Sequence, residues 1–175
     1  MDPVPSSMTL TIHSPHPDRT AALARQLAGL ARVGDVIALE GDLGAGKTTF
    51  ARAFVRAYLD RPDEDVPSPT FTLAQIYEPD ADGAHTAPVW HVDLYRLAGP
   101  EEAVELGIED AFAEAVTLIE WPDRLATLLP EDRLTVRLTP GPGEADRTIA
   151  LIPGTGWHDR LAALTAEGAD RTAAS

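Results

Sequence analysis

The fold of this chain is decided by one stretch of sequence, Gly41-Asp42-Leu43-Gly44-Ala45-Gly46-Lys47-Thr48. It matches the P-loop pattern, in which a glycine and four residues precede Gly-Lys-Ser/Thr and the backbone N–H groups wrap a polyphosphate. The lysine supplies a compact positive charge for the β- and γ-phosphates, and the final hydroxyl is placed to ligate Mg²⁺. The stretch therefore predicts a bound nucleotide and assigns Lys47 and Thr48 to its phosphates and metal.

The residues on both sides of this stretch have the pattern that a P-loop requires. Before it, residues 36–39 form a continuous apolar run, as a buried parallel strand does. After it, from Thr49 to Leu59, apolar residues recur at helical spacing. Lys47 is also the only lysine among the 14 lysines and arginines, at a position where an ammonium fits better than a planar guanidinium. Strand, glycine-rich loop and helix follow in the required order.

Length and composition indicate one cytoplasmic domain. The chain has 175 residues, 44% of them hydrophobic, which is enough for a single sizeable core. We expect a P-loop domain over residues 8–165, with flexible termini at residues 1–7 and 166–175. No signal peptide and no apolar run of membrane-spanning length is visible, and zero cysteines exclude disulfides and thiol chemistry.

The charge balance argues against direct, tight binding of nucleic acid by this chain alone. The formal net charge is −14, with 28 acidic residues against 14 scattered basic ones. Gripping a nucleic-acid backbone requires clustered lysines and arginines. An acidic surface that meets a basic protein partner fits this composition better.

Three further stretches carry candidate site residues, each with an ordinary alternative. Residues 68–72 (Ser-Pro-Thr-Phe-Thr) lie where nucleotide switch proteins place a threonine, although a turn entering a strand fits equally well. A strand over residues 89–94 puts His91 and Asp93 on one face with Tyr95, either solvated or as a hydrogen-bonding array. Residues 116–120 read as an apolar strand whose terminal Glu120 either reaches the Mg²⁺ shell or merely ends the strand.

The remaining pattern predicts an α/β fold with a mixed, mostly parallel central sheet flanked by helices. We expect a first strand over residues 8–12, a helix that begins between Pro15 and Asp18, and short helices on either side of Gly107. Two strands, residues 134–138 and 148–152, predict a C-terminal hairpin whose turn spans residues 139–143. A closing helix is expected from Trp157 to Leu164.

Taken together, these stretches resemble the TsaE (YjeE) family of bacterial P-loop ATPases. The resemblance covers about residues 10–152 and is carried by an ordered set of blocks. These are Gly-Asp-Leu-Gly-Ala-Gly-Lys-Thr-Thr (41–49), Ser-Pro-Thr-Phe-Thr (68–72), His-Val-Asp-Leu-Tyr-Arg-Leu (91–97) and Ile-Glu-Trp-Pro (119–122). A fifth block, Glu-Leu-Gly-Ile (105–108), is similar to the family's spacer. The first block occurs in many NTPases, whereas the ordered set is specific.

The resemblance implies a role in making the threonylcarbamoyl modification on adenosine 37 of tRNAs that read codons starting with A. That family does not transfer the threonylcarbamoyl group itself. It binds a TsaB–TsaD pair, and its hydrolysis of ATP, with Mg²⁺, resets that complex for further rounds. An ATPase that acts through proteins agrees with the acidic charge balance.

The resemblance also implies roles for individual residues. Thr70 would lie in a nucleotide-responsive switch, and Trp121 would pack near the nucleotide. Asp93 would lie near the γ-phosphate and metal, and Glu120 would be the Walker-B-like acid that holds Mg²⁺ together with Thr48. We therefore expect Lys47, Asp93 and Glu120 to be catalytic, and the sequence leaves open which of the two acids is nearer the attacking water.

Two other functions remain compatible with the sequence. A small-molecule P-loop kinase would pass the phosphoryl group to an acceptor instead of water, although no arginine-rich lid or acceptor pocket is recognisable. A nucleotide-gated adaptor would dock on a partner in its ATP-bound form, with slow or incidental hydrolysis. Phosphate release measured against formation of a phosphorylated product separates the kinase from the ATPase.

Overall fold

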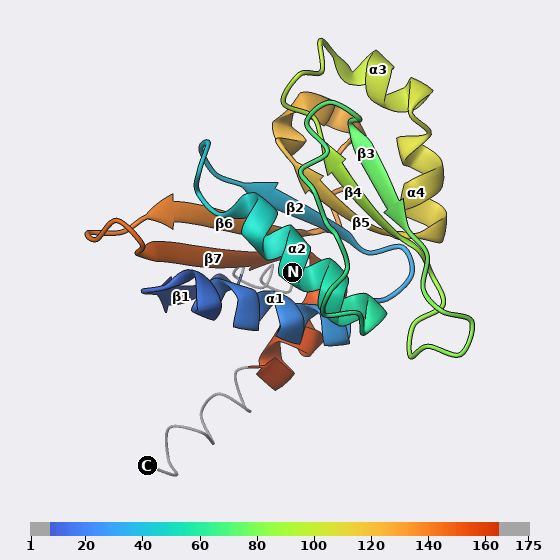
Figure 1. Cartoon of the computed structure of the whole chain (residues 1–175). Coiled ribbons are helices and arrows are strands. Elements are labelled where there is room, and N and C mark those ends of the chain that lie inside the picture. Colours follow the sequence, from blue (N-terminus) through green and yellow to red (C-terminus); the bar gives the residue numbers. More distant parts are fainter. Residues whose placement is uncertain (1–7, 165–175) are drawn as a thin grey trace, which may run out of the picture.

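The computed structural model describes residues 8–164 and is built around a seven-stranded sheet within that range (Figure 1). The segments predicted to be flexible, residues 1–7 and 166–175, lie outside the described residues. In chain order the elements are β1 (Leu10–Ser14), α1 (Pro17–Leu30), β2 (Val36–Glu40), α2 (Lys47–Leu59), β3 (Ala74–Tyr77), β4 (Val89–Asp93), α3 (Pro100–Glu105), α4 (Ile108–Glu114), β5 (Val116–Glu120), η1 (Pro122–Leu128), β6 (Leu134–Pro140), β7 (Arg147–Pro153) and η2 (Thr155–Trp157).

The sheet has a parallel centre and antiparallel edges. Its strand order is β1-β7-β6-β2-β5-β4-β3, in which β6, β2, β5 and β4 run parallel. The hairpin strand β7 pairs antiparallel with β6 and with β1, and β3 closes the opposite edge antiparallel to β4. The predicted α/β fold with a mixed sheet and a C-terminal hairpin is confirmed, with the parallel pairing confined to the four central strands.

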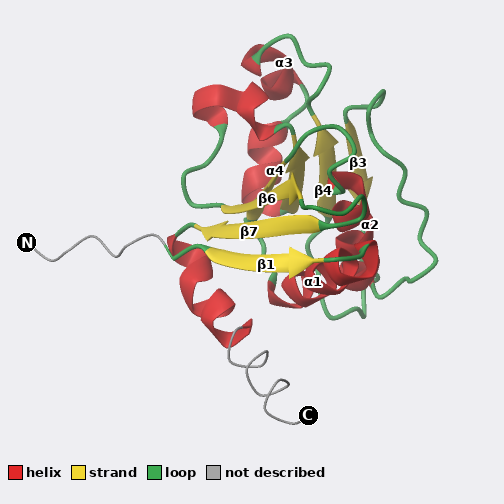
Figure 2. Ribbon diagram, turned by 90° about the vertical axis from the view of Figure 1, so that its left-hand side faces the viewer, coloured by secondary structure: helices red, strands yellow, loops and turns green. Residues whose placement is uncertain are grey.

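Helices cover both faces of the sheet, so each face has its own hydrophobic core (Figure 2). On one face, α1 and α2 pack on the sheet, and the rings of Phe50, Phe54 and Tyr58 stack along α2 with centroids 6.4 and 6.2 Å apart. On the other, residues from α3, α4 and η1 pack on the outward side chains of β2, β4 and β5. The central strands are buried on both faces, which explains their continuous apolar runs.

Several element boundaries differ from the prediction because pairing between strands sets them. β1 spans residues 10–14 instead of 8–12, since its partners on β7 run from Leu151 to Arg147. The hairpin strands extend to Pro140 and begin at Arg147, which moves the turn to residues 141–146. η1 was not predicted from the sequence, and the closing helix begins with the short turn η2.

None of the helices within residues 8–164 is long and apolar enough to cross a lipid bilayer.

One position in the sheet offers a stability gain. Thr117 on β5 is fully buried, and its hydroxyl has no hydrogen-bond partner within residues 8–164. A buried polar group without a partner loses its hydration and gains nothing in return. We expect Thr117→Val, which keeps the shape and removes the hydroxyl, to raise the free energy of unfolding by about 1 kcal/mol. Urea denaturation measures this, and a loss of stability would mean that the hydroxyl is bonded in solution.

Candidate nucleotide site

The P-loop joins the end of β2 to the start of α2, and two of its glycines are required by their surroundings. A Cβ on Gly41 would lie 2.8 Å from the carbonyl oxygen of Leu138, closer than real Cβ atoms come to backbone. Gly46 precedes α2 with a φ of +105°, a conformation that L-residues with side chains rarely adopt. These glycines bring the loop against β6 and aim the positive N-terminal end of α2 at the space beside it.

That space is a cavity of about 260 Å³ into which most of the predicted site residues converge. It is lined by Leu43, Gly44, Ala45, Gly46, Lys47, Thr48, Thr49, Ser68, Thr70, Asp93, Glu120 and Trp121. Asp93 and Glu120 meet there because they are register partners at the carboxyl ends of the parallel strands β4 and β5. The other two predicted residues, Gly41 and Asp42, line a neighbouring cavity.

Glu120 faces the first turn of α2. The Thr48 hydroxyl donates to its carboxylate, with Oγ1 3.2 Å from Oε1 and 3.4 Å from Oε2, and the acid is 3% exposed. Mg²⁺ prefers oxygen ligands and usually takes only one or two from the protein, completing its shell with water and phosphate oxygens. A threonine hydroxyl beside a carboxylate, next to a phosphate-binding loop, is a donor set that fits Mg²⁺ bound together with a nucleotide.

Lys47 is buried inside the loop, and its charge is surrounded by acceptors. Its ammonium donates to the backbone carbonyls of Gly41 and of Asp42, the latter at 2.9 Å, and lies 4.2 Å from the ring centroid of Trp121. Burial lowers the pKa of Lys47, while the charges of Glu120 and Asp93 oppose that change. The ammonium group therefore lies at the cavity and contacts the face of the Trp121 ring.

Asp93 is held by a neighbouring backbone group and by the predicted switch. Its Oδ1 accepts the N–H of Tyr95 at 2.9 Å, and its Oδ2 accepts the Thr70 hydroxyl at 3.4 Å. Thr70 in turn lies 2.8 Å from the Ser68 hydroxyl. Burial raises the pKa of Asp93, helped by the negative charge of Glu120. A carboxylate with a raised pKa is a better proton acceptor, which suits a group that orients or deprotonates water.

The raised pKa has a consequence for stability, because the folded state then holds the Asp93 proton more tightly than the unfolded state. Stability contributed by this group is therefore present below the ordinary pKa of 3.8 and is lost as pH rises through the folded pKa. We expect Asp93→Asn to raise the melting temperature of the nucleotide-free protein at pH 7, with the difference disappearing below pH 3.8. Differential scanning calorimetry across pH tests this; a stabilisation that grows in acid would contradict it.

The three residues of the expected array, His91, Asp93 and Tyr95, each contact a different residue. His91 and Asp93 are both buried, so the solvated-face interpretation of this strand is wrong. His91 contacts Glu120, whereas Asp93 contacts Thr70. Tyr95 lies beyond the end of β4 and packs on the Trp121 ring, with centroids 5.0 Å apart.

Arg147, the first residue of β7, was not recognised from the sequence. Its Nε donates to the carbonyl of Ala45 at 3.0 Å and its Nη2 to that of Gly44 at 3.1 Å, so it ties the hairpin to the P-loop. Nothing in the local sequence marks this contact, because the two P-loop carbonyls lie about one hundred positions earlier.

We expect Arg147→Ala to weaken nucleotide binding about tenfold, because two charge-assisted hydrogen bonds that hold the loop are lost. Titration with a fluorescent ADP analogue measures the change. The matched control is Arg137→Ala on the paired strand β6, whose half-exposed side chain bonds Glu40 and no loop carbonyl. A loss of affinity as large in the control would show that overall charge, and not the anchor, is responsible.

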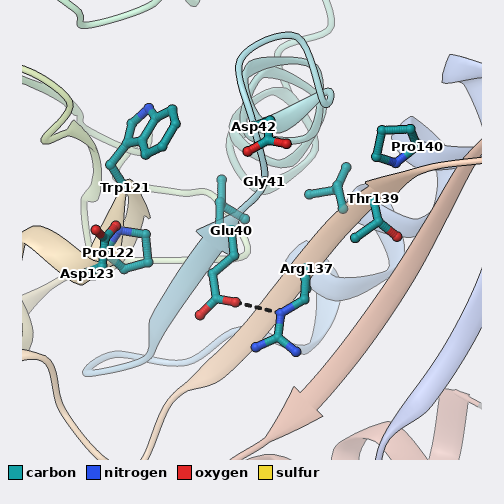
Figure 3. Close-up of a pocket in the computed structure, with 11 residues that line it drawn as sticks. Glu40, Gly41, Asp42, Trp121, Pro122, Asp123, Arg137, Thr139 and Pro140 are labelled. Carbon is teal, nitrogen blue, oxygen red and sulfur yellow. Dashed lines mark hydrogen bonds and ion pairs between the residues drawn. The ribbon is translucent and has the colours of Figure 1, made fainter.

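The neighbouring cavity, of about 360 Å³, lies between the ends of β2, β5 and β6 (Figure 3). Trp121, Pro122 and Asp123 stand on one side of it and Thr139 and Pro140 on the other, with the ion pair of Glu40 and Arg137 at 2.7 Å between them. Lys47, Thr48, Asp93 and Glu120 do not line it, so the residues predicted for phosphate chemistry meet in the smaller cavity of about 260 Å³, which we call the phosphate cavity.

Comparison with known proteins identifies what this chain is similar to. Residues 14–149 match the family model described as threonylcarbamoyl adenosine biosynthesis protein TsaE. The tRNA threonylcarbamoyladenosine biosynthesis protein TsaE of Bacillus subtilis is 40% identical over 123 residues, 69% of this chain and 72% of the relative. That of Streptomyces coelicolor is 38% identical over 123 residues, 70% of this chain and 80% of the relative. The crystal structure of YdiB from Bacillus subtilis superposes with a TM-score of 0.71 at 30% identity, covering 94% of this chain and 99% of that one.

Proposed function

The chain belongs to the TsaE family of tRNA threonylcarbamoyladenosine biosynthesis proteins, and on that premise we propose that it hydrolyses ATP with Mg²⁺ to drive a TsaB–TsaD complex. The observation that carries the proposal is the convergence of Lys47, Thr48, Asp93 and Glu120 in one cavity at the N-terminus of α2. Each supplies a part that phosphoryl transfer needs. We expect this activity in the cytoplasm, together with the TsaB–TsaD complex.

Phosphate binding is the first part. The backbone N–H groups from Leu43 to Thr49 cradle the polyphosphate, and the ammonium of Lys47 offsets the charge of the β- and γ-phosphates. Lys47 already lies beside the loop, where its bonds to loop carbonyls keep it in place. Trp121, whose ring covers the ammonium, packs beside the nucleotide and limits the access of water.

Metal binding and water orientation are assigned to three oxygen-bearing side chains. Thr48 and Glu120 would hold Mg²⁺, which when bound neutralises charge on the β- and γ-phosphate oxygens. Asp93 orients the attacking water or takes its proton, in keeping with its raised pKa from burial. Thr70, bonded to Asp93, links that acid to the segment expected to respond to the nucleotide.

Exposed side chains beside this cavity support a docking site for the partner. Leu43 in the P-loop is 72% exposed and Phe71, next to Thr70, is 83% exposed. The Arg96 guanidinium lies 4.5 Å from the ring centroid of Phe71. Exposed aromatic and arginine side chains are enriched where protein partners dock. We assign TsaB–TsaD docking to this rim, so that docking and hydrolysis influence each other.

The test is phosphate release from Mg·ATP by the isolated chain and then with the TsaB–TsaD pair added. The proposal expects weak release alone and a sharp increase with the pair. Phe71→Ala should retain the unstimulated rate and lose most of the stimulation. Formation of a phosphorylated small molecule in stoichiometry with ADP would instead identify a kinase, and nucleotide binding without stimulated hydrolysis would identify an adaptor.

A further inference from the structure

His91 is a buried histidine with one hydrogen-bonding nitrogen satisfied and the other not. Its side chain is fully buried on β4, and Nε2 lies 2.8 Å from Oε2 of Glu120. Within residues 8–164, its Nδ1 is one of few buried side-chain polar atoms that have no partner. The only polar contact of the ring that the structure contains is therefore the one to Glu120.

The surroundings of His91 favour an apolar residue. Val89, two residues earlier on the same face of β4, and Leu118, its register partner on β5, are both fully buried. Burying a polar nitrogen without a partner is unfavourable, and a leucine at this position would avoid it. Positions that break a local packing rule are commonly those that serve a site.

We propose that His91 is a positioning residue that fixes the Glu120 carboxylate for Mg²⁺. The buried imidazole contacts Oε2 at 2.8 Å, while the Thr48 hydroxyl lies 3.2 Å from Oε1 and 3.4 Å from Oε2. Rotation of the carboxylate away from Thr48 would break the contact with His91, so this contact favours the orientation in which Glu120 lines the cavity. The inference rests on the proposed metal role of Thr48 and Glu120.

The hydrogen-bond pattern also assigns the tautomer. An N–H on Nε2 is required to donate to the carboxylate, and an N–H on Nδ1 would find no acceptor. The contact with Glu120 therefore places a proton on Nε2 of the ring. An N–H on Nε2 orients the acid by bonding one of its two oxygens, Oε2. Groups behind a metal ligand commonly change metal affinity 10–100-fold when removed.

The experiment compares variants that keep or remove this donor. His91→Gln keeps an N–H at about the reach of Nε2, His91→Leu removes it at similar volume, and His91→Asn ends about where Nδ1 lies and falls short of Glu120. Thr117→Val is the matched control, since it changes the adjacent strand on the opposite face. For each variant, binding of a fluorescent ADP analogue is titrated in EDTA and then against Mg²⁺, with phosphate release and melting temperature measured in parallel.

We expect His91→Leu and His91→Asn to bind the analogue in EDTA within about twofold of the unsubstituted chain. In both variants, the Mg²⁺ concentration that gives half of the change in analogue binding should rise about tenfold or more. For His91→Gln and Thr117→Val, this Mg²⁺ concentration should remain within about threefold of the value for the unsubstituted chain. If His91→Leu does not fold, the comparison of His91→Asn with His91→Gln decides the same question.

Two results overturn the inference alone, and a third overturns the proposed function together with the inference. An unchanged Mg²⁺ response in folded His91→Asn or His91→Leu would show that the contact does not position Glu120. Equal losses in His91→Gln and His91→Asn, accompanied by lowered melting temperatures, would reduce the histidine to a packing role. Absence of nucleotide binding by the unsubstituted chain would instead refute the proposed function, and the inference with it.

Discussion

Replacing Lys47 by alanine should reduce phosphate release from ATP by about 10²–10³-fold, both with and without the TsaB–TsaD pair. The lysine is the only cation among the residues that line the phosphate cavity. Without it, the negative charge that develops on the transferred phosphoryl group is offset only by backbone N–H groups and the metal. Single-turnover assays at saturating ATP separate this loss from weaker binding.

Two further variants show whether charge or shape is responsible. Lys47→Arg keeps the charge but replaces a compact ammonium with a planar guanidinium, so it should recover little of the activity. Arg124→Ala removes one exposed positive charge outside the cavity and should leave the rate within about twofold. If Lys47→Ala keeps a rate within threefold of the unsubstituted chain, phosphate is not transferred in this cavity.

The second large effect is expected at the two acids and separates their roles. Glu120→Gln should lower hydrolysis by about 10²-fold and raise the Mg²⁺ requirement, because it loses the charge that holds the metal beside Thr48. Asp93→Asn should lower hydrolysis by about 10²–10⁴-fold while Mg²⁺ still strengthens ADP binding, because only water activation is lost. The measurements are phosphate release and the Mg²⁺ dependence of ADP binding for both variants.

The outcome of this comparison also fixes which acid is nearer the water, a question that the sequence left open. A variant with normal metal response and poor hydrolysis identifies the water-orienting acid, and one with a poor metal response identifies the metal ligand. Should both variants retain full partner-stimulated hydrolysis with unchanged Mg²⁺ dependence, the assignment of both acids is wrong. Because Asp93→Asn is also expected to stabilise the empty protein at pH 7, its lost activity would not be due to unfolding.

The elements around the P-loop could be predicted from sequence because local physics determines them. Residues 41–48 need glycines for a left-handed turn and for close approach to β6, and that demand is visible in the residues themselves. The apolar runs of β2 and β5 are visible for the same reason, since strands buried on both faces are mostly apolar. The parallel centre of the sheet followed from alternating strands and helices.

The boundaries and contacts that were not predicted depend on pairing between distant segments. The limits of β1 and of the hairpin are set by partners on other strands, which a local pattern does not contain. Arg147 reaches the P-loop only because β7 lies beside β6 at the edge of the sheet. The sequence predicted a strand from residue 148 and showed an arginine just before it, with nothing about what that arginine bonds.

The sequence by itself determined that this chain has a nucleotide-binding loop, which strands end in acids and which family it resembles. Only the tertiary structure decided that Asp93 and Glu120 are register partners, that Thr70 bonds the first and that His91 bonds the second. The reason is that a P-loop is specified by neighbouring residues, whereas the arrangement of side chains around it depends on sheet register. Register is fixed by packing of the whole core, and a shift of one residue would turn each of these side chains to the opposite face.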